Sequence, residues 1–453
     1  MKVKKNLITK LVNTHYFVWV LLFFMVILVT PNGQAQVWTL QQCIDTAQVN
    51  NKNLQIGRNN MALGEQRQME AKAYLIPKVN IGADYKYYFD LPYQLMPMTT
   101  FNPAASQGEF KEIQFGVAHN INANIQLAMP LYNPQVYGAI QTSKIATALT
   151  ELQYKETEEQ VFFDISNLYY NVQILKHQLV FIDSNMINTN KLLNNLQRLY
   201  QQQLITKTDL SKVELQKDQL NTQRDWVANN LNQVLNALKF SMGIPFSTNM
   251  EVDSEIQYQY GLIYANQQTI DIQMANTRNR LITSELKTLK NSKLPTASLM
   301  GNYSQVGFGY DVAPDEFLKF FPVSFVGVQL AYPLFNGTVT NRKINQKKLE
   351  IQNSELQISL ATEQNTMLIE NANNSRIITQ KTIENTLSQI NLARTVYEQT
   401  LLQQKEGTAN LTDVLLADNT LREAQQSYLS AVVEYLKADL ELQKLTGNLL
   451  NKN

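Results

Sequence analysis

The chain has 453 residues, and its 39 Lys and Arg against 38 Asp and Glu leave a formal net charge of +1. A near-neutral chain offers no basic field to nucleic acid, so we expect no nucleic-acid partner. The chain has only 16 Gly and 12 Pro, which indicates a helix-rich protein with few breaks.

Residues 1–35 are typical of a cleaved secretory signal peptide. Four lysines within the first ten residues precede an apolar run at 17–29, and small residues follow at 33–35. A membrane anchor is the alternative, although the apolar run is short for a helix that spans a bilayer. We expect the mature chain to begin near Gln36.

The next segment, 38–75, is predicted to be helical and contains Cys43, the only cysteine of the chain. A single cysteine allows no intrachain disulfide. We expect Cys43 to be a buried thiol, because Gln41 and Gln42 before it do not form a lipid-attachment context.

Two segments then alternate apolar and polar residues. From Val79 to Leu91 and from Ile113 to Met129, the odd positions are mostly apolar and most even positions are polar or small. A period of two predicts strands, and both runs exceed the about 9–11 residues that span a bilayer. His119 falls on the apolar phase, where a rim or packing residue is expected rather than a ligand.

The corresponding strands of the second half are less regular. Tyr303 follows one phase, whereas Val306 and Phe308 follow the other, which predicts a bulge or a sheet edge. A returning strand is predicted near Val326 to Tyr332. A soluble antiparallel sheet with one wet face is the alternative. In lipid, four strands cannot close into a barrel, so a membrane protein would need two, three or four chains to pool their strands.

Long helices follow each pair of strands. Apolar residues spaced by three and four along a helix predict the seam of a coiled coil. In the first copy the seams are Val161, Ile165, Leu168, Val172, Leu175, Leu179, Ile182, Met186, Thr189, Leu193, Leu196 and Tyr200, then Leu210, Val213, Lys217, Leu220, Arg224, Val227, Leu231, Val234 and Leu238. The second copy has Ile383, Leu387, Ile390, Tyr397 and Leu401, with more polar neighbours.

The chain contains the same pattern twice. LAMPLYN at 127–133 and LAYPLFN at 330–336 each follow a predicted strand and precede a long helix, and Asp209-Leu210 is matched with Asn410-Leu411. Such self-similarity indicates a duplicated unit. The offset between the copies drops between the paired strands, so a longer loop is predicted in the first copy near 92–112.

The predicted organisation follows from this repeat. It comprises a signal peptide at 1–35; a first repeat at 36–242, made of helices at 38–75, a β-hairpin at 76–133 and a long helical hairpin at 134–242; a linker at 243–265; a second repeat at 266–447, made of a helix at 266–293, a β-hairpin at 294–336 and a long helical hairpin at 337–447; and a C-terminal tail at 448–453.

Several motifs together resemble the TolC family of outer-membrane efflux and secretion channels, over nearly all of the mature chain. They are WTLQQCI at 38–44, YLIP at 74–77, the two LAxPLxN segments and GTANLTDVL at 407–415. The resemblance implies a mainly α-helical protein with a membrane β-barrel part. It would be a TolC-like homotrimer with a 12-stranded barrel, four strands per chain, on a long α-helical coiled-coil periplasmic tunnel.

The resemblance also implies partners and sites. The partners would be a periplasmic adaptor, an inner-membrane pump and outer-membrane lipid. The expected adaptor-contacting tips are Leu204, Thr206, Asp209, Leu210, Gly407, Thr408, Leu411, Asp413, Val414 and Leu415. Gln203 stands where a glycine is common, which leaves the first tip's geometry open, and Gly407 can also be read as a plain helix end. Glu398 and Arg394 are expected at the periplasmic aperture, with an ordinary surface pair as the alternative.

The predicted function is an outer-membrane exit duct that passively conducts drugs, small molecules or secreted proteins. No catalytic, metal or cofactor residues are expected, because His15, His119 and His177 lie in unsuitable segments and Cys43 has no evident base. The alternative is a periplasmic adaptor, or a structural coiled-coil envelope protein without a channel. An adaptor would have one helical hairpin rather than two.

Overall fold

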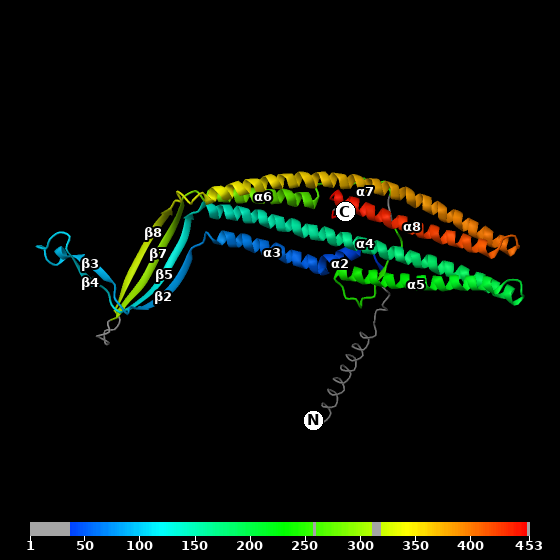
Figure 1. The fold of residues 1–453 in the computed structure, drawn as a ribbon, viewed down its shortest axis with the longest axis horizontal. Helices are drawn as coiled ribbons and strands as arrows, with labels where there is room; N and C mark the ends of the chain where they lie inside the picture. Colours follow the sequence, from blue (N-terminus) through cyan, green and yellow to red (C-terminus); the bar gives the residue numbers. More distant parts are fainter. Residues whose placement is uncertain (1–36, 257–259, 310–318, 451–453) are drawn as a thin grey trace, which may run out of the picture. The chain divides into compact units, whose positions relative to one another are not determined.

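The computed structural model describes residues 37–256, 260–309 and 319–450. The predicted signal peptide, the predicted start at Gln36 and residues 451–453 lie outside these ranges. Figure 1 follows the elements in chain order: β1 Val37–Trp38, α2 Leu40–Asn50, α3 Lys52–Ala73, β2 Lys78–Tyr87, β3 Tyr93–Pro97, η1 Met98–Thr100, β4 Phe110–Gln114, β5 His119–Tyr132, α4 Pro134–Gln201, α5 Lys207–Met242, β6 Glu251–Val252, α6 Ile270–Asn291, β7 Thr296–Gly309, β8 Lys319–Ala331, α7 Val339–Lys405 and α8 Leu411–Leu445.

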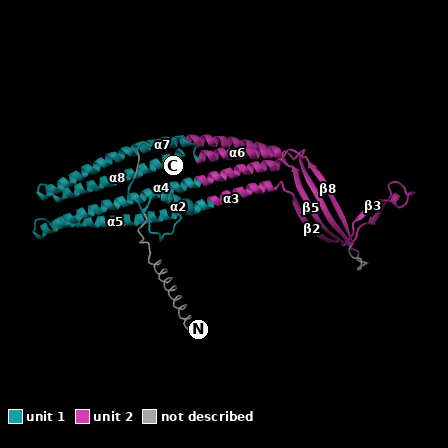
Figure 2. Cartoon of the chain, turned by 180° about the vertical axis from the view of Figure 1, so that it is seen from behind, with its two compact units in different colours: residues 1–56, 156–269, 364–453 teal, residues 57–155, 270–363 magenta. Residues whose placement is uncertain are grey.

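The chain forms two compact units, which Figure 2 colours separately. Unit 1 contains residues 1–56, 156–269 and 364–453, and unit 2 contains residues 57–155 and 270–363. Each unit takes segments from both predicted repeats, because the long helices α4 and α7 contribute to both units. The sequence repeat therefore describes the order of the elements and not the compact units.

The main sheet lies in unit 2, and its four antiparallel strands have the order β2-β5-β7-β8. Ile81 pairs with Ile125 and Tyr85 with Ile121, so one face collects the apolar phase of both strands. The opposite face carries polar pairs such as Asp84 with Asn122. Strands β2 and β8 are the two open edges of this sheet.

The structure corrects two details of the predicted strands. The run that begins at Ile113 is not one strand, because β4 ends at Gln114 and β5 begins at His119, with Gly116 at φ +126° between them. The segment between β2 and β5 instead contains the separate hairpin β3–β4. This hairpin occupies the region where the longer loop was predicted.

The bulge or sheet edge predicted in the second copy is also wrong, because β7 lies between β5 and β8. Strand β7 pairs with β8 without a register shift from Thr296 to Phe308. The shift lies in β5, between Pro130 and Tyr132. Proline lacks the N–H that a ladder hydrogen bond needs, so a register shift beside Pro130 has a direct physical cause.

The helices of unit 1 are held together by the predicted seams. Leu175, Ile182, Leu220 and Val227 form one buried cluster between α4 and α5. Three positions differ from the prediction, since Tyr200, Arg224 and Leu387 are exposed. Tyr200 is near the end of α4, where the seam runs out, and Leu387 belongs to the more polar second seam.

Cys43 is fully buried in α2, as predicted, and burial raises the pKa of its thiol to about 12. Helix α2 begins with a capping box in which Thr39 and Gln42 satisfy each other's backbone N–H groups. In the described ranges, no helix is both long enough and apolar enough to span a membrane.

Candidate functional site

The first helical hairpin turns between α4 and α5. The Leu204 N–H donates to the Leu199 carbonyl at 2.9 Å, and the Gln203 N–H donates to the Tyr200 carbonyl at 2.9 Å. Gln203 has φ +60°, in the left-handed region that a glycine adopts without steric cost. This residue therefore makes the turn at the expense of backbone strain.

The second helical hairpin turns between α7 and α8 in the same way. The Thr408 N–H donates to the Gln403 carbonyl at 2.9 Å, and Gly407 has φ +77°. Gln203 thus occupies the position that Gly407 holds in the second copy. The missing glycine does not change the geometry of the first tip.

Equivalent caps follow both turns. Thr206 and Asp209 form a capping box at the start of α5, and Asn410 and Asp413 form one at the start of α8. Asp209 is therefore the counterpart of Asp413 and not, as the repeat predicted, of Asn410. The hydrogen bond from Thr206 is the main cause that lowers the pKa of Asp209.

The predicted tip residues fall into an exposed group and a packed group. The exposed residues are Leu204, Thr206, Gly407, Thr408 and Asp413, and Asp209 is half-buried. The packed residues are Val414, which is 0 % exposed, and Leu210, Leu411 and Leu415, which pack against the same core cluster.

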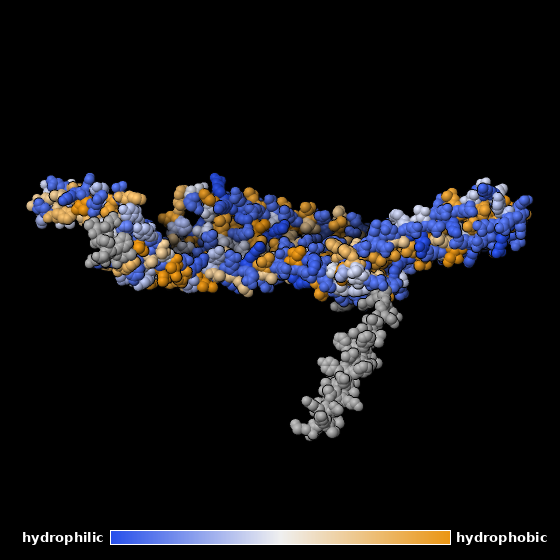
Figure 3. Space-filling view, turned by 90° about the horizontal axis from the view of Figure 1, so that it is seen from below, coloured by the Kyte–Doolittle hydropathy of each residue, from blue (hydrophilic) through white to orange (hydrophobic). Residues whose placement is uncertain are grey.

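Leu411, Val414 and Leu415, which the sequence places at the second tip, therefore pack toward the core rather than forming an exposed apolar surface. The apolar side chains that reach the surface near the turns are instead Leu204, 66 % exposed, Leu416, 67 % exposed, and Leu402. Figure 3 shows this end of the helices as mostly hydrophilic in that view. The sequence analysis did not identify Leu402 and Leu416. Both are apolar residues that lie outside the spacing of three and four expected for buried positions, and this is the signal that could have indicated their exposure.

Arg394 and Glu398 line one cavity of about 630 Å³ in unit 1, between α4, α7 and α8. Both side chains are exposed, and the described residues contain no ion pair between them. The surface pair considered from sequence is therefore absent. The same cavity is lined by Lys191, Arg198 and Lys405, so positive side chains outnumber Glu398 there.

Unit 1 also contains a buried polar cluster that the sequence analysis did not predict. Asp418 of α8 is 4 % exposed and accepts hydrogen bonds from Gln216 of α5 and from Arg422, with which it also forms an ion pair. Burial raises the pKa of Asp418, and Arg422 and Gln216 oppose that shift. Burial and the nearby Asp418 raise the pKa of Tyr397 to about 12.

This cluster joins the two helical hairpins, because Gln216 belongs to the first and Asp418 to the second. A second polar link has Asn185 of α4 donating to Gln425 of α8 at 2.9 Å, and it is also buried. Buried polar contacts of this kind fix the register between helices, since any slip leaves a partner unsatisfied.

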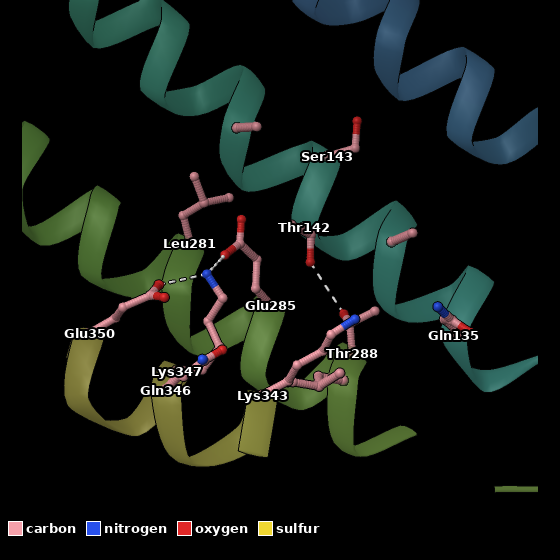
Figure 4. A pocket seen from close by; sticks show the side chains of 13 residues that line it. Gln135, Thr142, Ser143, Leu281, Glu285, Thr288, Lys343, Gln346, Lys347 and Glu350 are labelled. Carbon is pink, nitrogen blue, oxygen red and sulfur yellow. Dashed lines mark hydrogen bonds and ion pairs between the residues drawn. The ribbon is translucent and has the colours of Figure 1, made fainter. Parts of the chain in front are cut away.

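Unit 2 contains a larger cavity, of about 710 Å³, between α4, α6 and α7 (Figure 4). Lys347 of α7 reaches Glu285 of α6 at 2.8 Å and Glu350 at 2.6 Å, and these contacts raise the pKa of Lys347. Thr142 of α4 and Thr288 of α6, which also line the cavity, share a hydrogen bond of 3.3 Å. In the described ranges no group of three or more His, Cys, Asp or Glu could hold a metal ion.

The chain is similar in sequence and fold to proteins that are named as outer-membrane proteins or channels. The chain is 20 % identical over 426 residues to outer membrane protein TolC of Salmonella enteritidis, covering 92 % of this chain and 83 % of that protein. The solved outer membrane protein VceC of Vibrio cholerae superposes with a TM-score of 0.71 at 16 % identity, over 90 % of this chain and 96 % of VceC.

The Campylobacter jejuni outer membrane channel CmeC superposes with a TM-score of 0.73 at 15 % identity, over 90 % of this chain and 85 % of CmeC. No family model matches the chain. The superpositions show that the fold is that of the outer-membrane efflux channels. The resemblance to the TolC family that the sequence motifs carry is confirmed.

Proposed function

We propose that the chain is the outer-membrane exit duct of a tripartite export system. Three copies would pool their strands into one 12-stranded barrel, and their long helices would form a periplasmic tunnel. Substrates would enter from an inner-membrane pump through a periplasmic adaptor and leave passively. The proposal includes removal of residues 1–35 as a signal peptide and includes no catalytic step.

The four-stranded sheet carries this proposal. Its strands have 10 to 14 residues, enough to cross a bilayer. The apolar face is open to the surroundings, with Ile81 81 % exposed and Val326 78 % exposed. Both edges, β2 and β8, are unpaired within the part of the chain that the structure describes. Open edges are not tolerated in hydrocarbon, so a second copy must pair with each of them.

The relatives support the same reading. The matched proteins are named as outer membrane proteins or channels, and the match extends over about nine-tenths of this chain. The polar cavity that contains Arg394 and Glu398 is a reasonable candidate for the lining of the periplasmic aperture.

The primary test is assembly and conductance of the purified full chain. We expect a trimer by light scattering in mild detergent and stable ion conductance after insertion into a planar bilayer. A folded, monodisperse monomer that produces no conductance would overturn the proposal. N-terminal sequencing of the membrane-bound protein that recovered Lys2 would refute the cleaved signal.

The hairpin tips are proposed to contact the adaptor through their exposed residues, chiefly Leu204, Thr408 and Leu416. Gly407→Trp tests this contact, because a Cβ at Gly407 would meet open space within the chain. We expect Gly407→Trp to form normal trimers yet abolish export in cells that lack the wild-type copy.

The matched control is Gly407→Ala, which shares the unfavourable backbone conformation but adds little bulk. This control should export normally. Normal export by Gly407→Trp at normal trimer level would remove the tip from the adaptor interface and leave the channel proposal standing. A milder loss is expected from Leu210→Ala, because Leu210 packs on the core and supports the tip only indirectly.

A further inference from the structure

The strand register assigns every residue of the main sheet to one of two faces. The first face carries Ile81, Tyr85, Ile121 and Ile125 and is apolar across β2 and β5. The second face carries polar residues on the same strands: Asn80, Asp84, Lys86, Asn120, Asn122, Asn124 and Gln126. In the proposed barrel, the first face meets lipid and the second face meets the water-filled lumen.

Strands β7 and β8 break this rule on the second face. Val306 pairs with Phe321, and Ser304 pairs with Val323. Through β5 these pairs share the face of Asn122 and Asn124. We call Val306, Phe308, Phe321, Val323 and Phe325 the lumenal apolar patch. The patch explains why the apolar phase changes along β7 without the bulge that the sequence predicted.

The patch is a continuous cluster of side chains. The rings of Phe308 and Phe321 lie 6.0 Å apart with a 48° tilt between their planes, a distance typical of aromatic pairs. Phe325 lies on the same face four residues after Phe321, with Val323 between them, and pairs with Asn302. Aromatic surface next to amide side chains is suited to flat molecules that combine rings with polar groups.

The part of the patch on β8 is exposed, whereas Val306 and Phe308 on β7 are half-buried. Phe321 is 51 % exposed and Phe325 is 52 % exposed. In the proposed trimer, the strand that pairs with β8 is β2 of the next copy, whose residues on this face are mostly polar. Apart from Lys319, which pairs with Phe308, and Gln329 on the second face and Ser324 on the first, strand β8 is apolar on both faces. This pattern is typical of a strand that meets apolar groups on both sides. Lipid accounts for one side only.

We propose that the lumenal apolar patch contacts the exported molecules, and that these are small aromatic amphiphiles. This inference rests on the proposed function, since it requires that the second face lines a conduit. Three copies would place three such patches around the lumen. Weak, repeated stacking contacts would let such molecules enter without being retained, whereas a strongly hydrated cargo would gain nothing from the patch.

The test uses ethidium, an aromatic cation, and the purified full-length trimer. Fluorescence polarisation gives its dissociation constant for the wild type and for the double variant Phe321→Ser/Phe325→Ser. We expect the dissociation constant to rise about tenfold in the double variant, because two aromatic contacts are lost. Tetraethylammonium, an aliphatic cation of the same charge, should not displace ethidium.

The matched control is Phe320→Ser/Val326→Ser, which removes a similar apolar surface from the opposite face of β8. This control should bind ethidium as the wild type does. Equal weakening by both double variants would mean that ethidium binds detergent or the outer face, and would overturn the inference. So would displacement by tetraethylammonium, which indicates binding by charge alone.

Conductance separates this inference from the proposed function. If the wild type conducts and the double variant binds ethidium unchanged, the cargo inference fails and the conduit stands. If the wild type forms no trimer and no pore, the proposed function itself fails. Export of ethidium from cells, at equal trimer level, should fall in the double variant and not in the control.

Discussion

The two hairpin tips form a natural pair for a stability experiment. Gln203 and Gly407 occupy equivalent left-handed positions, at φ +60° and φ +77°. For a residue with a Cβ, this conformation costs about 1–2 kcal/mol. Glycine avoids that cost, but it makes the unfolded chain more flexible, which lowers the folding stability by about 0.4–1 kcal/mol. The difference favours glycine by roughly 0.8 kcal/mol.

We therefore expect Gln203→Gly to stabilise the first tip and Gly407→Gln to destabilise the second by the same amount. No steric term enters for Gly407, because a Cβ there meets nothing within 4 Å. A local free energy of this size changes the opening equilibrium about fourfold, since a factor of ten corresponds to about 1.4 kcal/mol.

Hydrogen exchange of the tip amides measures this opening directly. The reporters are Leu204 N–H, bonded to Leu199, and Thr408 N–H, bonded to Gln403. Exchange at Leu204 should slow about fourfold in Gln203→Gly, and exchange at Thr408 should quicken about fourfold in Gly407→Gln. Changes of the same sign in both variants, or no change in either, would refute the view that the left-handed residue limits the stability of the turns.

Three further predictions concern buried groups. Leu175→Glu puts a carboxylate into the cluster of Leu175, Ile182, Leu220 and Val227, so trimer yield by size exclusion should collapse; exposed Gln197→Glu is the control. The charged neighbour Lys176 would be a poor control for Leu175→Glu, because it is half-buried and donates a hydrogen bond to the Val252 carbonyl at 2.6 Å. Arg422→Met should lower the thermal unfolding temperature strongly at neutral pH and less at lower pH, because it leaves Asp418 unpaired. Burial already raises the pKa of Asp418, so the folded chain binds this proton more readily than the unfolded chain, and acid restores stability as the pH falls through the raised pKa; an unchanged deficit across pH would contradict this. Gly243→Ala should cost more than about 3 kcal/mol, against about 1 kcal/mol for Gly407→Ala, because its Cβ would lie 2.3 Å from the Asn50 carbonyl oxygen; equal unfolding temperatures of the two variants would exclude the clash.

The sequence predicts those features that depend on periodicity. The alternation around Val79 and Ile125 and the seam through Ile165 and Leu196 each reflect a buried or lipid-like face, which recurs at a fixed spacing. Ile165 is fully buried, and Leu196 is 1 % exposed, in agreement with that seam. The motif resemblance then supplied the fold, which the solved channels confirm.

Features that depend on contacts between distant segments were not predictable in this way. Asp418 looks like an ordinary surface residue of a helix, and only the approach of Gln216 and Arg422 reveals its burial. Val414 and Leu416 are both apolar and two positions apart, yet one faces the core and the other the surface.

The discontinuous make-up of the two units has a consequence for how the chain folds. The Trp38 carbonyl accepts hydrogen bonds from Tyr169 and Asp253, and the Thr446 carbonyl accepts one from Gln267, all within unit 1. Neither unit is complete until its last segment, after residue 270 in unit 2 and after residue 364 in unit 1, has arrived. Such long-range closure is slow, and strand β2 waits for β5 with its apolar side chains uncovered. If the chain is exported through a membrane as proposed, it would therefore have to be kept from aggregating until its last segment, from residue 364 onward, follows, and a holding chaperone would serve that purpose.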